Sequence, residues 1–223
     1  MRRVLGGIAP IQLAHLMRDG NPLFIPTNAG WTEVLVGSGT SNLSPFSLDV
    51  RTGTTASSSA LRQTQSLNGI HPGAGGYSAI NYDKKLLLVF SLARANSDAQ
   101  AVGRTQLKRA ATIGALADLG LGVREDNLVL VGESYGSALG ELDLSYTLTD
   151  ATPVRIAIFH NPTVPSIQFY VNWVLKDTQT TATKIPSGVA ATDNFLVRSI
   201  ANGITGGVNA LGFLSNIWGW IEP

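Results

Sequence analysis

The stretch from Ile167 to Pro186, IQFYVNWVLKDTQTTATKIP, indicates how the rest of the chain should fold. Its first five residues, IQFYV, alternate between the two faces of an extended chain, and this period of two is typical of a half-buried β-strand. Asn172 and Trp173 interrupt the alternation, and VLKDTQ then begins a return strand that ends in polar residues. The stretch therefore predicts a β-hairpin.

Most of the remaining chain also predicts strands. The 24 glycines and 10 prolines imply many turns, and 223 residues suit one all-β domain. Together with the hairpin, about ten strands connected mostly by short turns predict an antiparallel sandwich of Greek-key or jelly-roll type. The predicted strands are residues 31–36, 46–51, 82–94, 102–107, 122–131, 139–148, 154–159, 194–200 and 216–221.

Three stretches have no clear strand pattern. Residues 37–42 predict a turn, and the Ser-, Thr- and Gln-rich residues 52–68 predict a surface loop or an irregular edge. Residues 97–120 fit either one capped helix or the strand at 102–107 followed by one helical turn at 113–119, and we prefer the second. The basic cluster of Arg104, Lys108 and Arg109 in this stretch predicts a solvated face.

Residues 1–29 predict an N-terminal arm that precedes the sandwich domain at 30–223. Residues 9–18 could form a short helix, and DGNPLFIPTNAG is broken by prolines and should run extended. An arm of this size cannot form its own core, so it either lies on the domain or a neighbouring subunit, or is a disordered terminus. Apolar Leu23, Phe24 and Ile25 favour docking as an assembly contact.

The composition excludes several classes of function. The chain has no cysteine, which removes disulfides, thiolate metal sites and thiol nucleophiles. A net charge of +1 with 14% charged residues offers no basic face to nucleic acid. Asparagines and glycines in the uncharged stretch 199–221 argue against a membrane span. We expect no cofactor and no metal, since His15, His71 and His160 are far apart in the sequence.

The motif GESYG at residues 132–136 matches the G-x-S-x-G pattern of a serine hydrolase, in which Ser134 would be the nucleophile. That chemistry requires a strand–turn–helix context, but the sequence that follows, SALGELDLSYTL, alternates like a strand. The only later histidine is His160, in a turn before a proline. We therefore interpret the motif as a Gly-rich hairpin turn and expect no enzymatic activity.

The segment FYVNWVL at residues 169–175 resembles the FYVNGVL-type hairpin of concanavalin A-like sandwiches, the laminin-G and lectin-like family. The preceding VRIAIF strand and a final strand with Trp218 and Trp220 follow an order similar to that of these modules. The resemblance covers residues 30–223 and implies a jelly-roll sandwich. Such modules occur in secreted carbohydrate-binding proteins and on virus particles. The sequence departs from the pattern at Trp173, where glycine is usual, and no sugar or calcium ligands can be transferred.

Two hypotheses of function follow. The first is a structural component of a bacteriophage or virus surface, such as a capsid decoration, head fibre or tail protein. It would form homo-oligomers, with trimers favoured, and dock on other virion subunits through the arm. The second is a secreted lectin-like module that binds a cell-surface glycan through Trp173, Trp218 and Trp220, because sugar rings stack on exposed aromatic faces. Tryptophans in a sandwich are, however, more often part of the core.

The hairpin turn itself poses a conformational question. If Asn172 and Trp173 formed a two-residue type I′ turn, Trp173 would need a positive φ, which costs a bulky residue about 1–2 kcal/mol. Either the loop is longer than two residues, or a contact holds the tryptophan in place. The second case predicts a binding site or subunit contact at Trp173.

Overall fold

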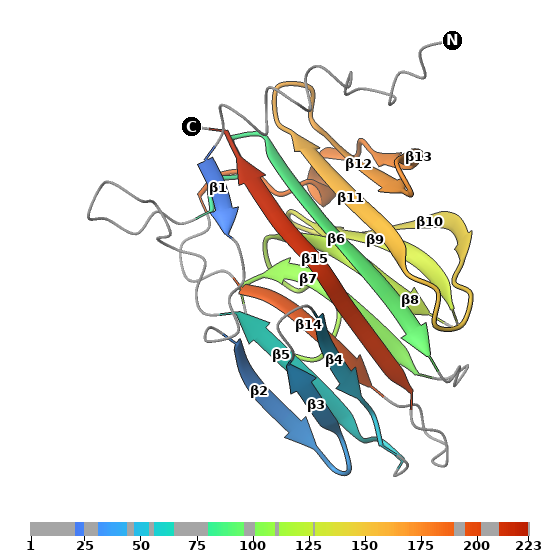
Figure 1. Ribbon diagram of the computed structural model, residues 1–223. Helices are drawn as coiled ribbons and strands as arrows, with labels where there is room; N and C mark the ends of the chain where they lie inside the picture. The colour runs from blue at the N-terminus through green and yellow to red at the C-terminus, as the bar shows by residue number, and fades with distance from the viewer. Residues whose placement is uncertain are drawn as a thin grey trace.

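The computed structural model is an all-β sandwich, in which the described residues form fifteen strands in two antiparallel sheets (Figure 1). The 3-10 helix η2 (Ala182–Lys184) is the sole helical element among the residues described below, none of which forms a helix able to cross a membrane. The predicted fold class is thus confirmed. The structure describes residues 21–24, 31–43, 47–53, 56–64, 80–95, 101–109, 112–126, 128–189, 195–201 and 210–222.

The first sheet has the order β13-β12-β11-β6-β15-β4-β3, and β1 pairs with the end of β15 beyond β4. The second has the order β10-β9-β8-β7-β14-β5-β2. The strands of the first sheet are β1 (Asn21–Phe24), β3 (Thr40–Leu43), β4 (Ser47–Arg51), β6 (Leu86–Ala95), β11 (Val154–Asn161), β12 (Ser166–Val171), β13 (Val174–Gln179) and β15 (Leu211–Ile221). Those of the second are β2 (Trp31–Val36), β5 (Ser59–Thr64), β7 (Val102–Lys108), β8 (Gly120–Asp126), β9 (Val129–Tyr135), β10 (Leu139–Thr147) and β14 (Phe195–Ala201).

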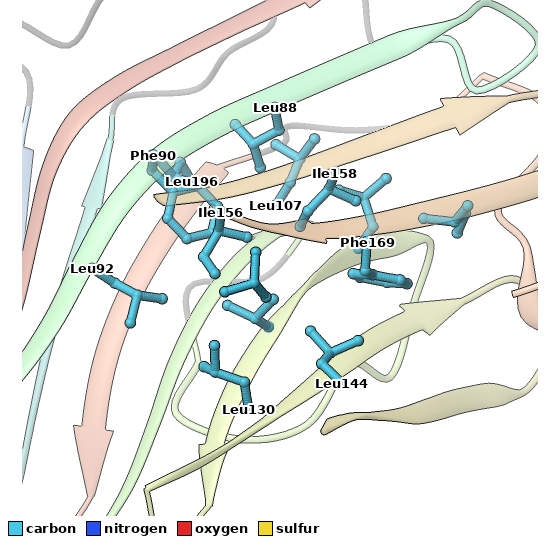
Figure 2. Close-up of a cluster of buried hydrophobic side chains, with 14 of the residues drawn as sticks. Leu88, Phe90, Leu92, Leu107, Leu130, Leu144, Ile156, Ile158, Phe169 and Leu196 are labelled. Carbon is cyan, nitrogen blue, oxygen red and sulfur yellow. The ribbon is translucent and has the colours of Figure 1, made fainter. Parts of the chain in front are cut away.

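The main core lies between the two sheets. Figure 2 shows Leu88, Phe90 and Leu92 of β6 pointing toward side chains that come from both sheets. The other face of β6 is also buried, with Leu87 and Val89 in a second apolar cluster. Burial on both faces explains the uninterrupted apolar run of this strand and its place inside the sheet.

Three predictions for individual segments were wrong. Residues 59–64 form β5 inside the second sheet and not a loop, because the polar side chain of Arg62 finds partners in Glu33 and Ser41. Residues 40–43 form β3, where only a turn was predicted. The single strand predicted at 122–131 is in fact β8 and β9, with a turn at Leu128, whose φ is 67°.

The helical turn predicted at residues 113–119 is also absent. Local hydrogen bonds occupy this segment instead: the ammonium of Lys108 donates to the main-chain oxygens of Thr112 and Gly114, and Asp118 accepts the N–H of Leu119. Side-chain bonds to nearby main-chain groups compete with helix formation. Lys108 is consequently buried, although a solvated basic face was predicted.

The arm is described only in part. Asn21–Phe24 form β1, which pairs with β15 through Asn21 opposite Ile221 and Phe24 opposite Gly219. This backbone pairing joins residues 21–24 to the sandwich. The predicted short helix and Ile25 lie outside the described residues, so the assembly contact assigned to Leu23, Phe24 and Ile25 stays a prediction.

A buried ion pair joins β8 and β14 of the second sheet across the strand that lies between them. Arg198 of β14 and Glu125 of β8 are both fully buried and form two contacts, one of them 3.1 Å long. Arg198 also donates to the hydroxyl of Thr105 on β7, the strand between them. A Cβ at Gly103 would lie 2.6 Å from the Glu125 carboxylate, and one at Gly212 would lie 2.2 Å from the guanidinium. A larger residue at either glycine would thus force the charged end of Glu125 or Arg198 to shift from its position in the pair.

We expect Arg198→Met to lower the free energy of unfolding by about 3–5 kcal/mol, because it leaves the Glu125 charge buried without its partner. Denaturant unfolding measures this change. Arg109→Met is the control, since its ion pair with Asp118 is 45% exposed on each side and should contribute less than about 1 kcal/mol. Equal losses for the two variants would contradict the assignment.

Candidate functional site at the β12–β13 turn

The β12–β13 turn has two residues, Asn172 and Trp173, between the paired residues Val171 and Val174. Their φ angles are 49° and 64°, as a type I′ turn requires. Of the two alternatives from the sequence, a longer loop is therefore wrong. Trp173 occupies the left-handed region of conformational space, where glycine is usual.

The start of β11 holds this turn in place. The N–H of Arg155 donates to the Asn172 side-chain oxygen at 3.0 Å, and the N–H of Asn172 donates to the Arg155 carbonyl at 2.8 Å. The Arg155 guanidinium lies 5.9 Å from the centre of the Trp173 ring, within cation–π range. One residue thus fixes the turn through both its backbone and its side chain.

A second cation–aromatic pair lies beside the first. The Lys176 ammonium of β13 is 5.5 Å from the ring centre of Tyr146, which belongs to β10 in the other sheet. The Asn172 amide lies 3.5 Å from the Tyr146 hydroxyl and so connects the two pairs. We call Tyr146, Arg155, Asn172, Trp173 and Lys176 the tip cluster.

The contacts of Trp173 act against the strain of its conformation. A bulky residue in this conformation costs about 1–2 kcal/mol, whereas an exposed cation–π contact contributes about 0.5–1 kcal/mol. Trp173 is 37% exposed, so burial of the rest of its side chain adds to the stabilisation from this contact. Residues held in such a strained backbone conformation gather at functional sites.

Backbone strain is concentrated around the tip cluster. Of the seven described non-glycine residues with positive φ, five are Leu128, Ser145, Ala151, Asn172 and Trp173. Ser145 precedes Tyr146, and the N–H of Leu148 donates to the oxygen of Leu128. These residues belong to the turns and bulge at one end of the sandwich. Strain at this end favours it as the functional end.

The structure separates the three tryptophans predicted to bind. Trp220 is 5% exposed and packs with Leu87 and Val89 on the outer face of the first sheet, and Trp218 is half-buried beside this cluster. Trp173 lies in a turn of a different strand pair. Only Trp173 presents an exposed ring, so the tip cluster contains one of the three predicted residues.

The sequence did not indicate that Arg155, Tyr146 and Lys176 belong to this cluster. Nor did it indicate the hydrogen bonds that the Asn172 side chain forms. A signal for Arg155 was nonetheless present. The turn after β11 makes β11 and β12 a hairpin, in which Ile156 lies opposite Val171, so Arg155 comes next to Asn172. Tyr146 is from the other sheet, and nothing local in the sequence brings it to this turn.

The residues of the GESYG motif do not form a catalytic arrangement. Ser134 is buried inside β9, and the turn to β10 comes only at Gly136. His160 directs Nδ1 toward the Lys84 carbonyl at 3.3 Å and Nε2 toward the Pro186 carbonyl at 3.1 Å, and therefore not toward Ser134. Burial lowers the pKa of His160, although these two hydrogen bonds oppose the shift.

A charged network on the outer face of the second sheet is internally neutralised. Buried Glu133 contacts Arg124 at 3.2 Å and Arg104 at 3.6 Å, and Arg124 also contacts Glu141. Within the described part of the chain, no three histidine or acidic side chains gather as metal ligands would. The tip cluster is thus the strongest candidate site.

Comparisons with known proteins agree on the fold. No protein-family model matches the chain, and no curated protein matches its sequence. The carbohydrate recognition domain of Emp47p superposes with a TM-score of 0.56 and 11% identity, covering 89% of this chain and 90% of that one. A β-glucanase from Bacillus licheniformis has a TM-score of 0.54 and 15% identity, covering 91% and 96%.

A sialidase also matches, with a TM-score of 0.53 and 11% identity, over 85% of this chain, which spans 17% of that protein. All three identities are low, so the likeness concerns the fold. The chain has a concanavalin A-like, lectin-like β-sandwich fold, which confirms the resemblance carried by the FYVNWVL hairpin.

The strain at Trp173 can be measured with a matched pair of variants. We expect Trp173→Gly to be more stable than Trp173→Ala by about 1 kcal/mol, because both remove the ring but only glycine adopts a positive φ freely. If the alanine variant were the more stable, Trp173 would not have the left-handed conformation.

Proposed function

We propose that the protein is a non-enzymatic, carbohydrate-binding module and that the tip cluster binds the sugar. The observation that carries the proposal is an exposed tryptophan, Trp173, in a conformation that costs stability. A residue that only served the turn would be glycine or asparagine. A tryptophan at this position is explained if its exposed ring binds a ligand.

The chemistry of the cluster suits a sugar. The apolar faces of sugar rings stack on aromatic side chains, and their hydroxyls accept and donate hydrogen bonds. The Arg155 guanidinium lies over the Trp173 indole and the side chain is 37% exposed, so a sugar ring would stack on the exposed part of the indole. The amide of Asn172 and the ammonium of Lys176 supply polar groups within the same cluster.

The fold is compatible with this activity but does not assign a site. Both the Emp47p carbohydrate recognition domain and the β-glucanase have names that refer to carbohydrates. Because one fold hosts many functions, this likeness supports the proposal only in general terms. The residues of the tip cluster carry the specific argument.

A glycan array, followed by titration of each ligand found, tests the proposal. We expect saturable binding that quenches tryptophan fluorescence, and at least a tenfold loss of affinity in Trp173→Gly, since stacking contributes on the order of 1.5 kcal/mol. Trp218→Phe, which changes a half-buried ring of another cluster, is the control and should bind normally. Absence of binding to every glycan, or full binding by Trp173→Gly, would refute the site.

A second candidate is the structural role, as a self-assembling component of a phage or virus particle. The observation that favours self-assembly is the edge strand β2, on which Val34, Leu35 and Val36 are 46%, 42% and 49% exposed. The opposite edge, β10, carries exposed Glu141 and Asp143, which protect it against pairing. The charged residue of the β2 edge, Glu33, is instead paired with Arg62 of the neighbouring strand β5, so the apolar residues beside it are less protected.

The partner of this edge would be a second copy of the chain. In a two-fold antiparallel pairing of β2 with itself centred on Val34, Glu33 lies opposite Leu35, so the two acidic residues do not face each other. Glu33 is also neutralised by Arg62 at 2.7 Å. Five paired residues bury less than the roughly 1,200 Å² of a stable interface, so the dimer should be weak. This geometry favours a dimer over the trimer expected from the sequence.

Analytical ultracentrifugation over a range of concentrations tests self-association. We expect a monomer–dimer equilibrium that the double variant Val34→Lys/Val36→Lys shifts entirely to monomer, because lysine on an edge strand opposes pairing. Val164→Lys is the control, as Val164 is 65% exposed in the β11–β12 turn. A native protein that stays monomeric at millimolar concentration would exclude this interface.

A further inference from the structure

We propose that residues 1–20 dock on the outer face of the first sheet of their own chain and cover an aromatic cluster there. This outer-face cluster consists of Leu87, Val89, Ala157, Phe159, Tyr170, Leu175, Trp218 and Trp220. It shares no residue with the tip cluster, so the proposal does not rest on the proposed function.

The outer face of the first sheet is apolar across five strands. Trp220, Leu87 and Phe159 are direct neighbours in one row across β15, β6 and β11. The next row extends to β13 and consists of Trp218, Val89, Ala157, Tyr170 and Leu175. The outer face of the second sheet instead carries the charged network described above. Because a sheet face that meets water usually carries polar side chains, the apolar face indicates a covering layer.

The outer-face cluster is shielded from water, although no described strand or helix lies over it. Six of its members, all except Leu175 and Trp218, are at most 6% exposed. The described strands form two sheets, and the second sheet packs on the opposite face of β6, against Leu88 and Phe90. A layer over the outer face would therefore have to come from residues that are not among those described, or from another molecule.

Trp220 gives an independent indication of such a layer. Its indole N–H is buried and has no hydrogen-bond acceptor among the described residues. The N–H of a buried tryptophan usually has a partner. A main-chain carbonyl of a segment that lies over Trp220 would accept this hydrogen bond.

The N-terminal arm is the occupant because of the place where it joins the domain. β1 begins at Asn21, and Pro22 lies opposite Trp220 in its pairing with β15 (Figure 1). Residues 1–20 are therefore attached to the domain beside the outer-face cluster. A segment attached at such short range has an effective concentration in the millimolar range. A second copy of the chain does not reach this concentration under ordinary conditions.

The length and the sequence pattern of the arm also fit the face. From β15 to β13 the face is four strand spacings wide, which is roughly 19 Å, and a helix over residues 9–18 would be about 15 Å long. In such a helix Leu13, Leu16 and Met17 would lie on one side and polar His15 on the other. The apolar side would pack on the outer-face cluster.

A spin label on the arm tests the proposal. The native chain has no cysteine, so a Gln12→Cys variant of the full chain carries one nitroxide at a defined position. An unpaired electron broadens the NMR signals of nearby protons. We expect the label to remove at least half of the intensity of the indole N–H signals of Trp218 and Trp220, which are assigned with single Trp→Phe variants.

A matched pair of double variants separates docking from mere proximity in the chain. Leu13→Asp/Leu16→Asp in the labelled chain should restore most of the intensity of both signals, because docking would bury two unpaired charges. His15→Asp/Arg18→Gln is the control and should leave the broadening unchanged. It alters the net charge equally, with histidine counted as neutral, but on the polar side of the predicted helix. Circular dichroism confirms that each variant is folded.

Two results would overturn the proposal within one chain. The first is full intensity of the Trp218 and Trp220 signals in the labelled chain. The second is equal recovery of intensity in the two double variants. A third result would assign the face to a second copy: mixing spin-labelled chains with isotope-enriched chains that lack the label would then broaden the two signals as strongly as the label does within one chain. That result would replace docking on the same chain with docking on a neighbouring subunit.

Discussion

The Glu125–Arg198 ion pair constrains the whole sandwich. Both side chains point into the space between the sheets, where each requires the other for its charge. A slip of one residue in β8 or β14 would turn one partner to the opposite face and leave the remaining charge buried alone. The Arg198 guanidinium lies against Gly212 of β15 in the facing sheet. The ion pair therefore also limits the distance and the relative position of the two sheets.

The tip cluster depends on the order that this interior imposes. Its residues come from β10 in one sheet and from β11 and the β12–β13 hairpin in the other, and the two sheets meet at the β10–β13 edge of the sandwich. The ladder from β6 through β11 to β12 brings Arg155 next to Asn172. A site on a turn thus obtains its geometry from strands that are buried far from solvent. Rigid elements hold such a site more accurately than loops do.

The fold was predictable because hydrophobic alternation is a local signal. The alternation of IQFYV and the apolar run of β6 were sufficient for an antiparallel sandwich. β5 was not recognised, because Arg62 is satisfied by Glu33 and Ser41, which are distant in sequence. At the site, the special position of Trp173 followed from turn stereochemistry alone. Arg155 and Tyr146 did not, since cross-strand register and the meeting of two sheets decide their proximity.

The two-residue turn at Asn172 and Trp173 also determines how the protein would meet a ligand. A longer loop would sample many conformations and lose that freedom on binding, at a cost of about 0.5–1.5 kcal/mol for each side chain ordered. Here the backbone is already restricted by the two hydrogen bonds to Arg155, and the Trp173 indole is already oriented by the Arg155 guanidinium. The conformational entropy of the turn is therefore lost during folding and not during ligand binding. Association at such a surface needs no slow rearrangement, and its rate should be set by diffusion and orientation.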